Sequence, residues 1–199
     1  MTDIDMNPAS EETLHIKHMV CNRCIMAVKS RLESLGLHPV SVELGIAVLP
    51  GKVTDELRQT VKEALEPLGF ELIDDKRAQV AEQIKDAVIE LVHYRGNELK
   101  VNLSDYLAAK LHRDYSALSK LFSETTGTTI EKYLIAQKIE RVKELLEYGE
   151  LSLNEIADRL NYSSAAYLSA QFKRVTGVTP RHFKKTQGGK RKPLDEVCL

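Results

Sequence analysis

The sequence predicts an α+β protein in which a small mixed domain precedes an all-α domain. Three observations support this prediction. Short alternating or continuously apolar runs, which are typical of strands, occur before residue 74. After residue 75 the apolar residues recur at helical spacing instead. Part of this helical region repeats itself after about 50 residues.

The composition is that of an ordinary globular chain. Its 199 residues are 43% hydrophobic and 29% charged, which argues against a disordered or collagen-like protein. No apolar run approaches the roughly 18 residues of a membrane-spanning helix, and the acidic start Met1–Asp5 lacks the pattern of a secretory signal. Three cysteines are too few for a disulfide framework. We therefore expect a cytoplasmic protein.

Charge is distributed unevenly along the chain. Residues 1–75 carry 7 Lys and Arg against 13 Asp and Glu, a net charge of −6. Residues 100–199 carry 17 against 12, a net charge of +5. This asymmetry indicates an acidic module joined to one that could bind a polyanion.

The first domain is predicted over residues 13–75, after a flexible N-terminus at 1–12. Alternation predicts a strand from Leu14, and a helical face follows at Val28, Leu32 and Leu35. The next predicted elements are strands at 40–44 and 46–49, a helix from Leu57 that ends at Gly69, and a strand at 70–73. The order β-α-β-β-α-β in about 60 residues is that of a ferredoxin-like domain.

The second domain is predicted over residues 76–186 and is all-α. Its first helix carries an apolar stripe from Val80 to Leu91. Such a stripe could join two copies into a homodimer, but we expect it to pack within its own domain. A long helix is expected from Ile130 to Tyr148.

The internal repeat lies on either side of this long helix. Leu107, Ala108 and Leu111 recur 49 residues later as Ile156, Ala157 and Leu160. A second set recurs 50 residues later: Leu118, Ser119, Phe122, Thr126, Gly127 and Thr129 match Leu168, Ser169, Phe172, Thr176, Gly177 and Thr179. Because the one-residue slip falls where a turn would lie, each unit is predicted to be a helix-turn-helix.

Residues from about 80 to 185 resemble the DNA-binding domain of AraC/XylS-type transcription regulators. The resemblance covers more than half of the chain and depends on these segments: Leu103–Ala108, Tyr115–Phe122, Gly127–Thr129, Gln137–Leu146, Leu153–Ala157, Tyr162–Ser164, Phe172–Arg174 and Thr176–Pro180. It implies two helix-turn-helix units joined by a long helix, with double-stranded DNA as the partner and no cofactor needed for DNA binding.

Polar and small residues of the two second helices are the candidate DNA-binding positions. In the first unit they are Arg113, Ser116, Ala117, Ser119 and Lys120. In the second unit they are Ser163, Ser164, Ala165, Ala166, Ser169, Ala170, Lys173 and Arg174. We expect Lys120 to bond guanine. Since the second set is rich in alanine, we expect that unit to hold phosphates through Ser163, Lys173 and Arg174.

The C-terminal residues 187–199 are predicted to be a flexible tail. Their basic run ends at Lys192, and such a run attracts phosphates without regard to sequence. A purely solubilising role is the alternative.

A Cys-x-x-Cys motif lies between the first strand and the first helix. Cys21 and Cys24 can converge on one ion, and the helix start, Arg23 and Lys17 would lower their pKa. Two thiolates suit a soft ion such as Cu(I). With Met19, the motif resembles that of heavy-metal-associated (HMA) domains, over about residues 13–74 including Gly69–Phe70. The resemblance implies that Cys21 and Cys24 are metal ligands.

Other interpretations of the motif stay open. Zinc would require further ligands, for which His18 is placed better than His15. Disulfide redox chemistry and a cysteine pair without any ligand are the remaining alternatives. Met19 is expected to pack beneath the loop, and Cys198 is expected to have no role.

These observations favour a transcription regulator that senses a soft metal ion or thiol chemistry. A cytoplasmic copper-handling protein, with the helical part as an interaction module, is the alternative function. No nucleophile–base pair, phosphate-binding Gly-rich loop or paired carboxylates suggest an enzyme.

Overall fold

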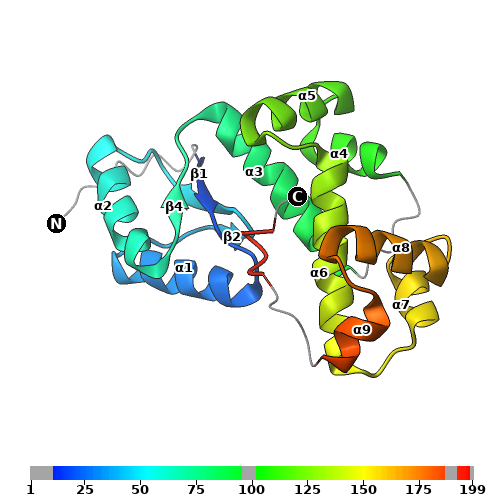
Figure 1. Ribbon diagram of the computed structural model, residues 1–199. Helices are drawn as coiled ribbons and strands as arrows, with labels where there is room; N and C mark the ends of the chain where they lie inside the picture. The colour runs from blue at the N-terminus through cyan, green and yellow to red at the C-terminus, as the bar shows by residue number, and fades with distance from the viewer. Residues whose placement is uncertain (1–10, 96–101, 187–191, 198–199) are drawn as a thin grey trace. The chain divides into compact units, whose positions relative to one another are not determined.

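The structure, a computed structural model, describes residues 11–95, 102–186 and 192–197 (Figure 1). The chain forms two compact units, Met1–Asp86 and Ala87–Leu199, which divide within helix α3 (Lys76–Ile89). The boundary that we predicted, between residues 75 and 76, lies at the start of this helix, whereas the two units divide between residues 86 and 87. Within the described ranges, no helix is long and apolar enough to cross a membrane.

The N-terminal unit contains a small antiparallel sheet. In its described residues, four strands form the sheet in the order β2-β3-β1-β4: β1 (Glu11–Lys17), β2 (Ser41–Glu43), β3 (Ile46–Pro50) and β4 (Glu71–Leu72). Helix α1 (Asn22–Ser34) follows β1, and α2 (Asp55–Leu65) with the short helix η1 (Glu66–Leu68) follows β3. The predicted order of elements, β-α-β-β-α-β, is therefore found.

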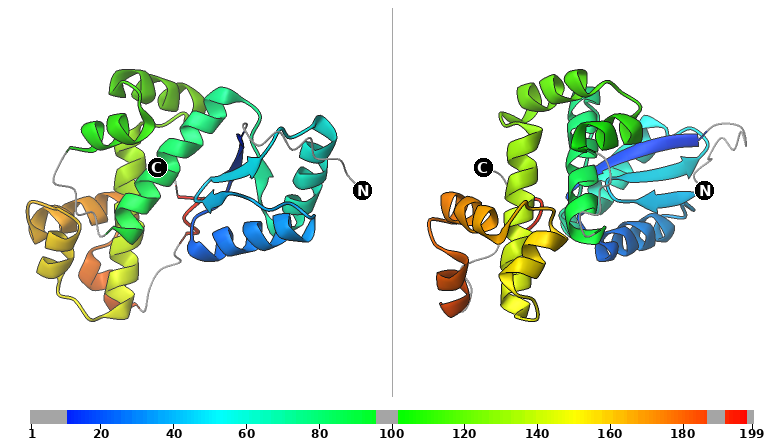
Figure 2. Two further views of the ribbon diagram at one scale, coloured as in Figure 1. Left: turned by 180° about the vertical axis from the view of Figure 1, so that it is seen from behind. Right: turned by 90° about the vertical axis from the view of Figure 1, so that its right-hand side faces the viewer.

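The core of this unit lies between the sheet and the two helices (Figure 2). Leu14 and Ile16 lie on the same face of β1, because successive strand residues point to opposite faces. Both side chains are fully buried. They share a cluster with Leu32 of α1 and with Val61 and Leu65 of α2. Both helices therefore pack on the same face of the sheet.

Strand β1 begins earlier than predicted. Glu11 and Glu12 were assigned to the flexible N-terminus, but they pair with Pro50 and Leu49 of β3. The Glu12 carboxylate accepts hydrogen bonds from the Val53 backbone N–H at 2.7 Å and from Arg58 at 2.6 Å. These partners are distant in sequence, so the local pattern could not reveal them.

The C-terminal unit is helical. After α3 comes a π-helical turn, η2 (Glu90–Tyr94). The six helices that follow among the described residues are α4 (Leu103–Leu111), α5 (Tyr115–Thr126), α6 (Ile130–Tyr148), α7 (Leu153–Arg159), α8 (Ala165–Thr176) and α9 (Pro180–Lys185). Helix α6 has the bounds that we predicted and contacts η2, α5, α8 and α9. The predicted stripe from Val80 to Leu91 is buried.

Figure 1 shows α4 and α5 at one end of α6, and α7, α8 and α9 at the other. At each end, two aromatic rings pack against each other, and the two pairs occupy equivalent positions of the repeat. The rings of Phe122 and Tyr133 are 5.9 Å apart, and those of Phe172 and Phe183 are 5.5 Å apart. The repeat thus extends further than the sequence analysis found, so that α9 matches the first turns of α6.

Part of the predicted flexible tail is held against α6. The Lys192 backbone N–H donates to Glu140 at 3.3 Å, and the Leu194 carbonyl accepts from Gln137 at 2.9 Å. Gln137 and Glu140 are buried, so their polar groups require partners of this kind. Residues 187–191, 198 and 199 of the predicted tail, among them Cys198, lie outside the described residues.

We expect Phe122→Ala and Phe172→Ala each to lower the free energy of unfolding by about 3–5 kcal/mol. Both side chains are fully buried, so truncation leaves a cavity beside α6. Urea denaturation measures the loss. Met26→Ala, at a side chain that is 63% exposed, is the control and should change little. A phenylalanine variant as stable as this control would contradict the packing described.

Candidate nucleic-acid interface

The two helix pairs, α4–α5 and α7–α8, turn in the same way. His112 and Asn161 follow α4 and α7 closely, and both adopt the left-handed conformation, with φ of 51° and 52°. One residue further on, the N–H of Arg113 reaches the Ala108 carbonyl at 3.3 Å and that of Tyr162 reaches the Ala157 carbonyl at 2.9 Å. Residues that are 49 positions apart in the sequence therefore occupy equivalent positions in the two turns.

The second helix of each pair is capped by a side chain. Asp114 accepts hydrogen bonds from the N–H groups of Ser116 and Ala117 at the start of α5. Ser164 accepts from the Tyr167 N–H, at 3.1 Å, at the start of α8. The Ser116 hydroxyl also donates to Asp114, and these hydrogen bonds lower the pKa of the Asp114 carboxyl. The hydroxyls of Ser116 and Ser164 thus have structural partners.

The second helices also end alike. Gly127 and Gly177 adopt positive φ values of 73° and 81°, which disfavour other residues. The hydroxyls of Thr126 and Thr176 donate to the Phe122 and Phe172 carbonyls at 2.7 and 2.8 Å. The same glycine and threonine interactions therefore end α5 and α8 at equivalent positions.

Most predicted DNA-binding residues of the first pair are exposed. Arg113, Ser116, Ala117 and Lys120 lie on the solvent side of α5 or just before it. Ser119 is only half-buried, because it lies next to Leu118 at the edge of the packed face. Lys120 is the long cation among them.

The predicted residues of the second pair divide similarly. The exposed ones are Ser163, Ser164, Ala166, Ala170, Lys173 and Arg174. Ala165 and Ser169 are half-buried. Most of these exposed residues have small side chains in the first turns of α8 and positively charged side chains in its last turn.

Tyr167 is the surface residue that our sequence analysis missed. It lies in the first turn of α8 and is 54% exposed. The 50-residue offset places it at the position of Ala117, which was among the predicted residues. Applying the repeat position by position would have identified it.

The two pairs differ in charge. Where α8 has Lys173 and Arg174, the repeat places Ser123 and Glu124 in α5. Lys120, in turn, is matched by Ala170. Helix α9 adds the exposed cations Arg181, Lys184 and Lys185 to the second pair.

A polar cluster supports the start of α8. Lys138 of α6 donates to the Leu160 carbonyl at 2.8 Å and lies 5.1 Å from the centre of the Tyr162 ring. The Tyr162 hydroxyl donates to Gln171 of α8 at 2.7 Å. Burial lowers the pKa of Lys138 to about 8 and raises that of Tyr162.

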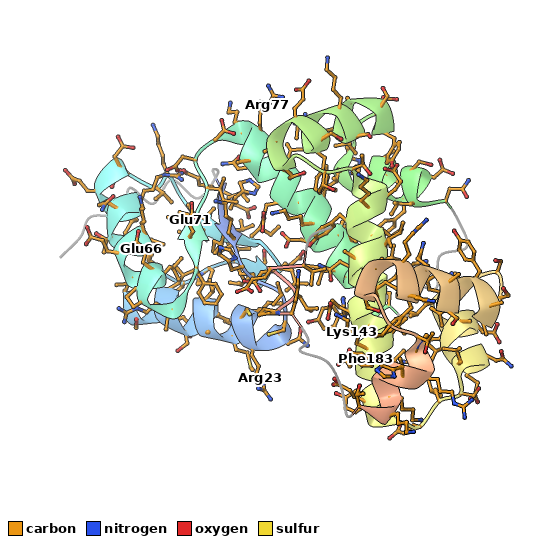
Figure 3. All side chains as sticks on the ribbon, in the orientation of Figure 1. Arg23, Glu66, Glu71, Arg77, Lys143 and Phe183 are labelled. Carbon is orange, nitrogen blue, oxygen red and sulfur yellow. The ribbon has the colours of Figure 1, made fainter. Side chains whose placement is uncertain are left out.

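The two motif cysteines lie together at the start of α1. Cys21 precedes the helix, and its sulfur is 3.3 Å from that of Cys24. Burial acts to raise the pKa of Cys21, but the hydrogen bonds from Cys24 and the positive charge of Arg23 outweigh it, and the pKa is lowered. Burial raises the pKa of Cys24. Figure 3 shows Arg23 pointing away from the helix.

The surroundings of the cysteines differ partly from expectation. Met19 is buried in the core, as expected for a packing residue. Lys17 pairs with Glu71 at 2.9 Å instead of acting on the thiols. Within the described residues, no group of three or more His, Cys, Asp or Glu could hold a metal ion, so the motif presents two sulfurs.

Residues 107–186 match a family model described as a helix-turn-helix domain. The Xylose operon regulatory protein of Escherichia coli is 33% identical over 99 residues, which are 49% of this chain and 25% of that protein. The Msm operon regulatory protein of Streptococcus mutans is 32% identical over 99 residues, which are 49% of this chain and 34% of that protein.

The C-terminal half is an AraC/XylS-type helix-turn-helix domain. The match spans only a quarter to a third of the length of these relatives. Their names describe regulators, not enzymes. The family match extends over α4 to α9 and does not reach the sheet-containing unit.

Two solved structures are similar to part of this chain. The C-terminal domain of AraT, a response regulator from Geobacillus stearothermophilus, has a TM-score of 0.48 at 23% identity and covers 58% of this chain and 92% of that one. The DNA-binding domain of AdpA, in complex with a target DNA, has a TM-score of 0.42 at 25% identity and covers 50% and 91%.

Lys138→Met should flatten the dependence of stability on pH. The folded pKa of about 8 lies below the ordinary lysine value, so from pH 8 upward the unfolded chain binds more protons and wild-type stability rises. Between pH 7.5 and 9.5 we expect wild type to gain roughly 1 kcal/mol relative to the variant, after allowing for solvent screening.

Urea denaturation at both pH values gives this difference. The raised pKa of Tyr162 acts in the opposite direction only above about pH 10, outside the window. Lys132→Met, at an exposed position on the same helix, is the matched control. Equal pH dependence in the Lys138 and Lys132 variants would contradict the buried environment of Lys138.

Proposed function

We propose that this chain is a sequence-specific DNA-binding transcription regulator of the AraC type. The observation that carries the proposal is the pair of equivalent helix pairs. Each has a left-handed turn residue, a side-chain cap and an aromatic pair at matching positions. Each pair has the form of a helix-turn-helix, whose second helix enters the major groove of DNA. Double-stranded DNA is accordingly the partner.

The cations of the two units have different tasks in this proposal. Lys120 on α5 is suited to bond the O6 and N7 atoms of guanine and thus to read sequence. Lys173 and Arg174 on α8, with the cations of α9, are suited to phosphates, which fix position but carry no sequence information. Names of the matched relatives, which are operon regulatory proteins, support the same class.

Duplexes selected by the full-length wild-type chain from a random pool provide the test. We expect Lys120→Ala to weaken binding to the preferred duplex by about 1–3 kcal/mol and to relax its sequence preference. Lys173→Ala should weaken binding to all duplexes alike and reduce the dependence of affinity on salt by about one unit of slope.

Lys29→Ala, an exposed cation of α1, is the matched control and should change neither quantity. Equal effects of Lys120→Ala and Lys173→Ala on preferred and random duplexes would refute the division of tasks. A folded wild-type chain that binds no duplex at low salt would refute the regulator function itself.

We further propose that the N-terminal unit is a ferredoxin-like domain that senses a soft metal ion through Cys21 and Cys24. The strand order β2-β3-β1-β4 and the two helices on one face support the fold. The sulfur–sulfur distance of 3.3 Å supports the site, since both thiols can turn to one ion. A soft monovalent ion such as Cu(I) suits two thiolates.

Anaerobic titration with Cu(I) tests the metal proposal. Wild type should bind one ion, and the Cys21→Ser/Cys24→Ser variant should lose it, whereas Cys198→Ser should retain it. If the ion regulates DNA binding, operator DNA must change the metal affinity, ordinarily by the equivalent of about 1–3 kcal/mol. Metal binding that survives the double substitution refutes the site, and an affinity unchanged by DNA refutes the sensor.

A further inference from the structure

We propose that Tyr167 determines sequence specificity in the second unit by packing its ring on the 5-methyl group of a thymine. The inference rests on the proposed function and names the base that α8 recognises. It assigns base recognition to the helix that we expected only to hold phosphates. A large exposed aromatic ring on an otherwise small-sided helix face is the observation behind it.

The position of Tyr167 favours contact with a base. Its N–H is bound to the capping Ser164, so it lies in the first turn of α8. In helix-turn-helix proteins, the N-terminal residues of the second helix are those that contact base edges. Its neighbour one turn further on the same face is Ala170, whose small side chain leaves the ring uncovered.

The ring is also held from behind. The Tyr162 and Tyr167 rings are 6.2 Å apart and tilted by 51°. Tyr162 is itself buried and fixed by its hydrogen bond to Gln171 and by Lys138 over its face. Tyr167 therefore loses little conformational freedom on binding, which favours an apolar contact.

Charge directs this face toward DNA. Lys173 and Arg174 lie on the same helix, two turns beyond Ala166 and Tyr167, and can hold the phosphates that flank the groove. In the major groove, thymine presents a methyl group that cytosine lacks, and apolar side chains can contact it. A tyrosine ring between alanines, with cations at the helix end, fits this chemistry.

The experiment replaces each thymine of the selected duplex in turn by deoxyuridine, which removes only the methyl group. For the full-length wild type we expect at least one position where affinity falls about fourfold, the value of one buried methyl group. Tyr167→Ala should bind the thymine duplex more weakly and show no further loss at that position. Tyr167→Phe should behave like wild type.

Two controls complete the design. Lys120→Ala should retain the sensitivity to deoxyuridine at that position, and Tyr148→Ala, at a tyrosine that is 65% exposed at the end of α6, should match wild type throughout. Undiminished sensitivity in Tyr167→Ala, no sensitive position in wild type, or a loss in Tyr167→Phe equal to that in Tyr167→Ala would overturn the inference. If wild type selects no duplex at all, the proposed function itself has failed.

Discussion

The C-terminal unit depends on α6, because both helix pairs pack on this one helix. Near its start, Tyr133 packs against Phe122 of α5. Helix α6 also packs against α8 and α9. Its 19 residues extend about 28 Å, close to the roughly 34 Å of one turn of DNA. A helix of this length is therefore compatible with the proposed function, in which the two second helices enter successive turns of the major groove.

The scaffold and the surface of the repeat have diverged to different degrees. Positions that hold each helix pair together are the same or similar: Phe122 matches Phe172, and Gly127 matches Gly177. Exposed positions differ in size and charge, because they are free of the packing constraint. One backbone design thus carries two surfaces with different chemistry.

Features with a local physical cause could be predicted from the sequence. The bounds of α6 follow from capping and periodicity, since Thr129 caps its first turn and Gly149 ends it. Long-range contacts could not be predicted, such as the hydrogen bonds that place Glu12 in β1 and those that hold Lys192 and Leu194 to α6. Neither segment has a periodicity that marks its partner.

The candidate interface was predictable to a similar extent. Helical spacing identified Lys120 and Lys173 as exposed, whereas Ser119 and Ser169 lie at the edge of the packed face, and periodicity alone does not resolve such borderline positions. Tyr167 is not among the predicted DNA-binding residues, because an aromatic side chain in a helix is usually assigned to the core. Only the offset of the repeat, which places it at the position of Ala117, indicates that it faces solvent.

The unequal thiols of the N-terminal unit limit what this site can do. The pKa of Cys21 is lowered and that of Cys24 is raised, so Cys21 is the first to become a thiolate and its partner donates a hydrogen bond to it. A metal ion held by both sulfurs must displace the proton of Cys24 as well. In the proposed metal site, affinity should therefore rise with pH until that proton is lost from the free protein. If the proposed site binds a metal ion, burial of Cys24 opposes that binding at low pH, and the Cys21 thiolate would be the first ligand.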